Sequence, residues 1–152
     1  MDAFRELRRH FSDPGIGYDL IRMYLGIGLV IRGALFVAHP DVLISWTENT
    51  GKWFTPMIVA HYVAAAHIFG GILLALGLRT RLAAAVQVPI LLGAVFFVHR
   101  AEGLLTAGQS LEFAALVLVM LVTYGAFGSG RISLDNWLEQ RLRELPPRQV
   151  QT

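Results

Sequence analysis

The chain of 152 residues contains no cysteine and few charged side chains, which make up 16% of the total. The absence of thiols excludes disulfide exchange, thiolate metal sites and iron–sulfur clusters held by this chain alone. It also excludes the dithiol chemistry with which some small membrane proteins act on quinones. The charged fraction is well below the roughly 25% of an average soluble domain. Hydrophobic residues reach 55%, so the composition indicates a membrane protein.

The hydrophobic residues are concentrated in four blocks, at 18–39, 57–78, 82–99 and 111–127. A helix rises about 1.5 Å per residue, so blocks of this length cross a hydrocarbon core of about 30 Å. A soluble four-helix bundle is disfavoured, because the second and fourth blocks lack a polar face. We therefore predict an all-α fold, an integral membrane four-helix bundle with its transmembrane domain at 18–130.

Amphipathic segments flank the four blocks. Residues 1–17 are charged and show no small-residue cleavage site, so we expect an interfacial segment on the cytoplasmic side rather than a signal peptide. In residues 131–152, one helical face collects Leu134, Trp137, Leu138, Leu142 and Leu145. This pattern predicts a second interfacial helix, followed by a cytoplasmic tail.

The arginines predict the orientation of the chain. Three precede the first block, two lie between the second and third, and four follow the last, against only Lys52 and Arg100 on the other side. The positive-inside rule places both termini in the cytoplasm. We expect a multi-pass protein of a bacterial or archaeal cytoplasmic membrane. The net charge of +2 is explained by topology and lipid contact, without a nucleic-acid partner.

Two arginines lie inside the first block. An ionised side chain in hydrocarbon costs at least about 2.5 kcal/mol, so each needs a partner. Arg22 is expected to snorkel toward the cytoplasm beside Asp19. Arg32 lies about 10 Å below the outer edge, and we predict that it approaches Glu112, which opens the fourth block. The pair is either structural or borders an anionic or quinone-like ligand.

Three histidines are expected near the outer surface together with Glu112. His39, His61 and His99 with this carboxylate form a donor set that zinc, copper or iron accepts. However, no helix carries the i, i+4 histidine pair typical of such sites. We therefore expect interfacial histidines in contact with solvent rather than a metal site.

His67 is expected near the middle of the membrane, beside Gly70 and Gly71. Small residues at this spacing allow close helix contact, so His67 should face the bundle as a neutral ring. Its partner is then a backbone carbonyl or a polar side chain such as Gln87. A proton or quinone role is the alternative, and haem ligation is disfavoured because no second histidine lies at the same depth.

Three segments carry a resemblance to a known family. They are "GGILLALGLRTRLAA" at 70–84, Glu112, and "GSGRISLD" at 128–135. The chain resembles, from about Tyr18 to Leu138, the DoxX-like family of small four-helix membrane proteins, which includes the DoxD-type membrane subunit of thiosulfate:quinone oxidoreductase. That family often has a carboxylate three residues before the paired glycines, where this chain has His67. At the cytoplasmic face we expect a structural cluster of Thr80, Arg81, Arg131 and Asp135, with Thr80 capping the turn and the arginines around Asp135.

The resemblance implies work near membrane redox systems. We expect a non-catalytic or accessory subunit of a respiratory or other redox complex, bound to lipid and to other membrane subunits or its own copies. The alternative is a quinone-handling oxidoreductase subunit, with electrons supplied by a partner and no covalent cofactor. Its candidate pocket residues are Arg32, His61, His67, Gln87, His99 and Glu112. A small transporter is a further alternative, and enzymatic activity is left open.

Overall fold

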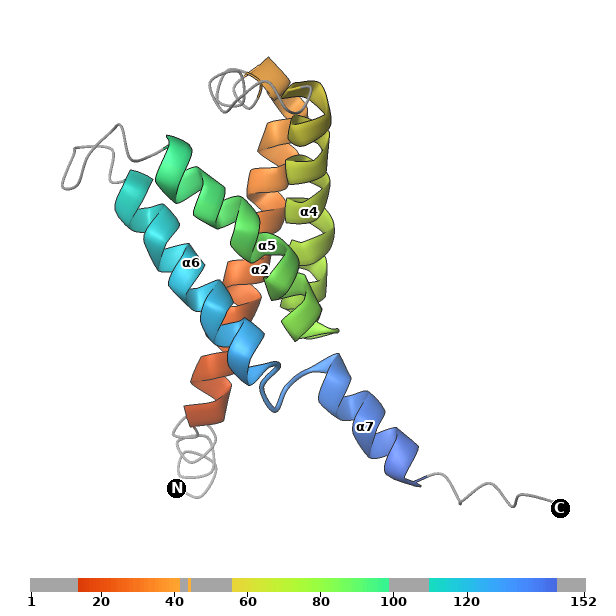
Figure 1. Cartoon of the computed structure of the whole chain (residues 1–152). Coiled ribbons are helices and arrows are strands. Elements are labelled where there is room, and N and C mark those ends of the chain that lie inside the picture. Colours follow the sequence, from red (N-terminus) through yellow and green to blue (C-terminus); the bar gives the residue numbers. More distant parts are fainter. Residues whose placement is uncertain (1–13, 42–43, 45–55, 99–109, 145–152) are drawn as a thin grey trace, which may run out of the picture.

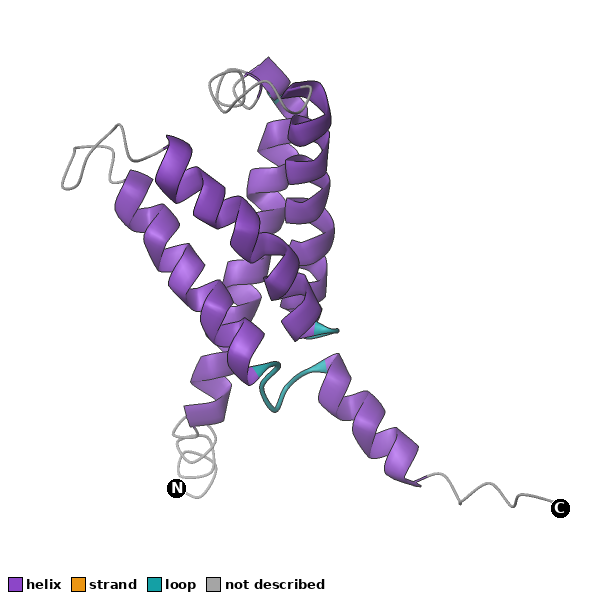
Figure 2. Cartoon of the chain, in the orientation of Figure 1, coloured by secondary structure: helices purple, strands orange, loops and turns teal. Residues whose placement is uncertain are grey.

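The computed structural model describes residues 14–41, 44, 56–98 and 110–144, and all regular structure in these ranges is helical (Figure 2). The helices are α2 (Pro14–Ala38), α4 (Pro56–Leu76), α5 (Thr80–Gly93), the π-helix η1 (Ala94–Val98), α6 (Ser110–Phe127) and α7 (Leu134–Glu144). The all-α prediction is confirmed for this part of the chain. Most of the predicted N-terminal segment lies outside the described residues.

The helices form two packed pairs. α2 packs along α4, α5 packs along α6, and contacts between α4 and α5 join the pairs (Figure 1). The start of α2, the α4–α5 turn and α7 all lie at one end of the molecule, here called the turn end. Near this end, α2, α4, α5 and α6 share a core that includes Leu25, Leu74, Ala84 and Leu121.

The outer surface of the helices is strongly apolar. Three helical segments are long and apolar enough to cross a membrane, namely Gly15–Ala38, Met57–Leu76 and Ser110–Phe127. Only 22% to 39% of the most apolar window of each is buried, so most of these side chains face outward. Such a surface would associate in water, whereas in a bilayer it contacts the acyl chains.

The predicted span at 82–99 differs from the other three. It corresponds to α5, a shorter apolar helix that contains Pro89 and continues as η1. The described segment nevertheless remains helical from Thr80 to Val98. Its crossing of the membrane, and with it the complete four-helix bundle, stays a prediction.

The end of α4 is fixed by a glycine turn. Gly77 has a φ of 69°, a conformation that glycine adopts without a steric penalty. The Gly77 N–H donates to the Leu74 carbonyl at 3.1 Å, and the Leu78 N–H donates to the Leu73 carbonyl at 2.9 Å. This paired arrangement is the Schellman motif that terminates many helices. The chain then reverses into α5 through Arg79, which also has a positive φ of 47°.

Candidate functional site

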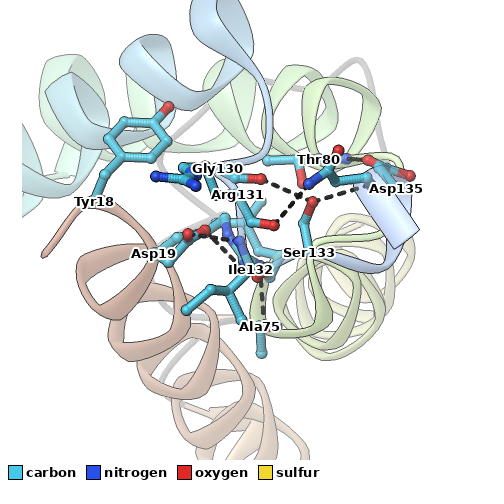
Figure 3. Close-up of polar contacts among 12 residues, drawn as sticks. Tyr18, Asp19, Ala75, Thr80, Gly130, Arg131, Ile132, Ser133 and Asp135 are labelled. Carbon is cyan, nitrogen blue, oxygen red and sulfur yellow. Dashed lines mark hydrogen bonds and ion pairs between the residues drawn. The ribbon is translucent and has the colours of Figure 1, made fainter. Parts of the chain in front are cut away.

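A buried ion pair lies where α2, the α4–α5 turn and the α6–α7 connection meet (Figure 3). Arg22 Nη2 is 3.3 Å from Asp19 Oδ1, one helical turn away, and both side chains are 1% exposed. Two buried charges are tolerated only when further hydrogen bonds satisfy their remaining donors and acceptors. We call the pair, together with Asp135 and the backbone of residues 74–80 and 128–133, the helix-end cluster.

Arg22 binds backbone carbonyls from two distant segments. Nη1 donates to the carbonyl of Leu74 and, at 3.1 Å, to that of Ala75, while Nη2 donates to the Ile132 carbonyl at 2.7 Å. The carbonyls in the last turn of a helix lack intrahelical partners and carry its negative dipole end. The guanidinium therefore completes the end of α4 and attaches the α6–α7 connection to it.

Asp19 binds the same peptide segment from the other side. The Ile132 N–H donates to Asp19 Oδ2 at 2.8 Å, so the ion pair holds both backbone polar groups of Ile132. Gly130 makes this approach possible, because a Cβ there would lie 2.6 Å from the Asp19 carboxylate carbon. This contact gives a physical reason for a glycine at Gly130 in the "GSGRISLD" segment.

Asp135 caps α5 from a different element. Its carboxylate accepts hydrogen bonds from the N–H of Arg79 at 2.9 Å and of Thr80 at 3.4 Å. The Asp135 N–H in turn donates to the Gly77 carbonyl at 3.1 Å. The first N–H groups of a helix have no intrahelical acceptor, so Asp135 supplies the missing one. The sequence prediction gave this role to Thr80, but in the described part of the chain its buried hydroxyl makes no hydrogen bond.

The structure shows one contact at each of two arginines of the predicted cytoplasmic cluster, and the gathering of the arginines around Asp135 stays a prediction. The side chain of Arg81 passes over Gly128, with Nε 3.1 Å from the position that a Cβ on that glycine would take. The Arg131 carbonyl accepts a hydrogen bond from Asn136 Nδ2 at 2.9 Å. In the helix-end cluster, the carboxylates of Asp19 and Asp135 and the guanidinium of Arg22 bind mainly backbone groups.

Two tyrosines attach the end of α6 to α2. The Tyr18 hydroxyl donates to the Gly128 carbonyl at 2.9 Å, and the Tyr124 hydroxyl donates to the Tyr18 carbonyl at 2.8 Å. Their ring centroids are 4.7 Å apart. Sequence reasoning missed both residues, although a tyrosine near the end of an apolar block needs a partner for its hydroxyl.

Replacement of Asp135 by alanine is expected to lower the free energy of unfolding by about 1–2 kcal/mol, the usual effect of losing a helix cap. Glu139→Ala, in the exposed part of the same helix, is the matched control and should leave stability unchanged. Thermal unfolding in mild detergent, followed by circular dichroism, measures both. Equal melting temperatures for the two variants would contradict the capping role.

A second group of polar residues lies deeper, between α2 and α4. His67 is 3% exposed, and its Nδ1 is 2.8 Å from the Val63 carbonyl. A carbonyl only accepts, so Nδ1 carries the proton and Nε2 of the neutral ring is an acceptor. The Phe36 ring meets the imidazole edge-on, with centroids 5.5 Å apart, and the Arg32 guanidinium carbon lies 5.3 Å from the Phe36 centroid. We call Arg32, Phe36, His67 and Gln87 the mid-bundle cluster.

Gln87 reaches α4 from α5 but binds backbone rather than the imidazole. Its Nε2 donates to the Ala66 carbonyl at 2.8 Å. A Cβ on Gly70 would lie 2.8 Å from that nitrogen, so this glycine makes room for the amide. Gln87 Oε1 is buried without a hydrogen-bond partner in the described part of the chain. The amide thus leaves one acceptor beside the helix that carries His67.

The outer residues of the predicted pocket are only partly described. His61 is exposed and its Nδ1 donates to the Met57 carbonyl at 2.7 Å, while His39 is exposed just after α2. Glu112 lies in the first turn of α6, and its approach to Arg32 stays a prediction. His99 lies outside the described residues, among which no group of three metal-ligating side chains occurs. The predicted donor set therefore remains untested.

The comparisons with known proteins identify the family. A family model named DoxX matches residues 17–100, which is more than half of the chain. The match includes the segment 70–84, while Glu112 and the segment 128–135 lie outside it. No curated protein and no solved structure matches the chain. With its apolar helices of membrane-crossing length, the chain is therefore a membrane protein that belongs to the DoxX family.

Proposed function

We propose that the protein is a non-catalytic, accessory subunit of a membrane redox complex. The observation that carries the proposal is that buried polar side chains bind the backbone of neighbouring helices. Arg22, Gln87 and Tyr124 each donate to backbone carbonyls of a neighbouring helix. These donors hold helices together, as a structural subunit requires. The redox setting comes from the DoxD-type subunits that the family includes.

The outer surface supports the same proposal. On α6, the outward apolar side chains include Phe113, Leu116, Val119 and Val122, each at least 51% exposed. Apolar helix faces of this kind pack against lipid or against the helices of another subunit. We also propose that the turn end faces the cytoplasm, because it carries Arg79, Arg81 and Arg131.

Affinity purification in mild detergent, from cells that express the tagged protein at its native level, tests this proposal. The expected result is co-purification with larger membrane subunits that show a reduced-minus-oxidised absorption spectrum. Deletion of the chain should then reduce the amount of that complex on a native gel. Recovery as a lone chain, with the amounts of all redox complexes unchanged in the deletion strain, would contradict an accessory role.

A quinone-handling subunit is the second candidate, and the mid-bundle cluster favours it. His67 Nε2 and Gln87 Oε1 are acceptors for quinol hydroxyls, and Arg32 is a donor for a quinone carbonyl. A quinone site needs such groups and a route for protons. A partner subunit would have to bring the electrons.

Under this second candidate, His67→Leu is expected to lower the quinone content of the purified protein about tenfold, roughly the 1.4 kcal/mol typical of one lost hydrogen bond. Tyr62→Leu is the matched control, since that side chain is on the same helix, is 54% exposed and is not among the candidate pocket residues. Quinone extraction and chromatography measure the content. A site at His67 would be ruled out if the unmodified protein contained no more quinone than a blank preparation. Equal loss of quinone in both variants would also rule it out.

A further inference from the structure

Helix α7 carries an apolar face that no described element covers. Four side chains share an arc of about 140° on an ideal helix. They are Leu134, Trp137, Leu138 and Leu142, with exposed fractions of 39%, 53%, 42% and 66%. None of the residues of α7 is buried within the described part of the chain. The helix is too short and too polar to cross a membrane, so its apolar face needs another partner.

The helix-end cluster fixes the level at which α7 begins. Both backbone polar groups of Ile132 are bound by the ion pair, and the Asp135 N–H is bound to the Gly77 carbonyl. Ser133 Oγ accepts from the Asn136 N–H at 3.2 Å, as an N-cap does. α7 therefore starts level with the α4–α5 turn, where α4 ends, and runs away from the bundle (Figure 1). In a bilayer this level corresponds to the lipid headgroups.

Exposed apolar side chains also lead along the chain from the end of α6 to α7. Phe127, at the end of α6, is 76% exposed, and Ile132, in the connection, is 57% exposed. Leu134 then begins the face of α7. The guanidinium carbon of Arg141, which falls on the same face, lies 5.3 Å from the Trp137 ring centroid. Tryptophan is enriched at the membrane interface, and an arginine there keeps its stem in the apolar layer and its charge in the headgroups.

We propose that α7 lies in the headgroup region of the bilayer, with this apolar face against the upper acyl chains, and that the helix-end cluster sets its depth. The occupant of the face is lipid, because exposed apolar side chains lead along the chain from α6 into it and because Trp137 with Arg141 beside it is typical of the membrane interface. This inference does not depend on the proposed redox role. It makes α7 a surface anchor of the bundle rather than a docking helix for another protein.

Trp137 provides a direct probe. The chain has three tryptophans, so Trp46→Phe with Trp53→Phe leaves Trp137 as the only one. The purified variant is placed in phosphatidylcholine vesicles, with or without bromine atoms on the upper part of the acyl chains. We expect weaker emission from the vesicles with brominated lipid, because an interfacial ring lies about 5–10 Å deep, at the boundary between headgroups and acyl chains. Equal emission in the two kinds of vesicle would overturn the proposal.

Two comparisons separate lipid contact from other occupants. Leu142→Ser on the apolar face should weaken the quenching, whereas Gln140→Ser on the polar face should not, and equal effects would count against the assigned face. Reconstitution with ten times as much brominated lipid per protein should leave the quenching unchanged. Quenching that rises on dilution would show that a second copy covers Trp137, and this would overturn the proposal.

The depth-setting role of the helix-end cluster has its own test. Asp135→Ala removes the two hydrogen bonds that its carboxylate accepts from the Arg79 and Thr80 N–H groups of the α4–α5 turn, while leaving the apolar face intact. Bromine placed at a series of acyl-chain positions should then show a changed or broader depth profile for Trp137. A profile identical to that of the parent single-tryptophan protein would overturn this part of the inference.

Discussion

Replacement of Arg22 by methionine is expected to destabilise the protein by about 3–5 kcal/mol, the usual effect of removing one partner of a buried ion pair. The carboxylate of Asp19 would remain buried without its cation. The carbonyls of Leu74, Ala75 and Ile132 would also lose a donor that they now share. An SDS titration in mixed micelles, followed by circular dichroism, measures the loss of folded protein.

Two further variants locate the cause of that loss. Arg143→Met removes an ion pair with Glu139 whose side chains are 83% and 70% exposed, and no measurable change is expected because exposed pairs contribute little. The double variant Asp19→Leu with Arg22→Met should be more stable than Arg22→Met alone, since no unpaired charge remains buried. If Arg22→Met were as stable as Arg143→Met, the buried pair would have no structural importance.

Helix content and membrane character were predictable because they depend on local hydropathy. Helices of membrane-crossing length occur at three of the four predicted places, and the family suggested by the segment 70–84 is confirmed by the matched range. The shorter α5 was less predictable. Hydropathy alone does not show where an apolar helix changes to the π-helical form of η1.

The helix-end cluster was predicted only in part, because its main partners are backbone groups. Sequence reasoning paired Arg22 with Asp19, one turn away, but expected the guanidinium to snorkel toward the aqueous phase. The structure buries it against carbonyls 52 and 110 residues away. The carbonyl of Ile132 has no sequence signature, so this contact could not be foreseen. Gly130 was recognised as part of a motif, although its reason appears only once Asp19 is beside it.

In the mid-bundle cluster, too, the sequence did not show in which direction each side chain points. Depth along the helices suggested Gln87 as a partner of His67, but it did not show which atoms each would bind. Gln87 binds the Ala66 carbonyl, and His67 binds the Val63 carbonyl within its own helix. Phe36 gave no signal, because an apolar residue in an apolar block is equally suited to face lipid or a histidine.

Replacement of Gly26 by alanine is expected to disrupt the contact between α2 and α4. A Cβ on Gly26 would lie 2.6 Å from the carbonyl oxygen of Gly71 and 2.8 Å from the Cα of Ala75. Both are backbone atoms of a helix, so the two helices would have to separate. Overpacking of this kind costs about 1–3 kcal/mol and occasionally more.

Gly28 provides a matched control on the same helix. A Cβ there would meet nothing within 4 Å, so Gly28→Ala should leave the packing unchanged. The better helix propensity of alanine should even raise stability by up to about 0.5–1 kcal/mol. The same SDS titration compares the two alanine variants. Equal stability of Gly26→Ala and Gly28→Ala would show that the helices are not in close contact at Gly26.

The opposite side of this contact predicts non-additive effects. A Cβ on Gly71 would lie 2.7 Å from the Gly26 carbonyl oxygen and 2.9 Å from the Val30 nitrogen. Gly71→Ala should therefore force the same separation as Gly26→Ala. Once one substitution has moved the helices apart, the second meets less resistance, so the double variant should lose less stability than the sum of the single losses. A strictly additive loss would mean that each alanine acts within its own helix and that the two glycines do not share one interface.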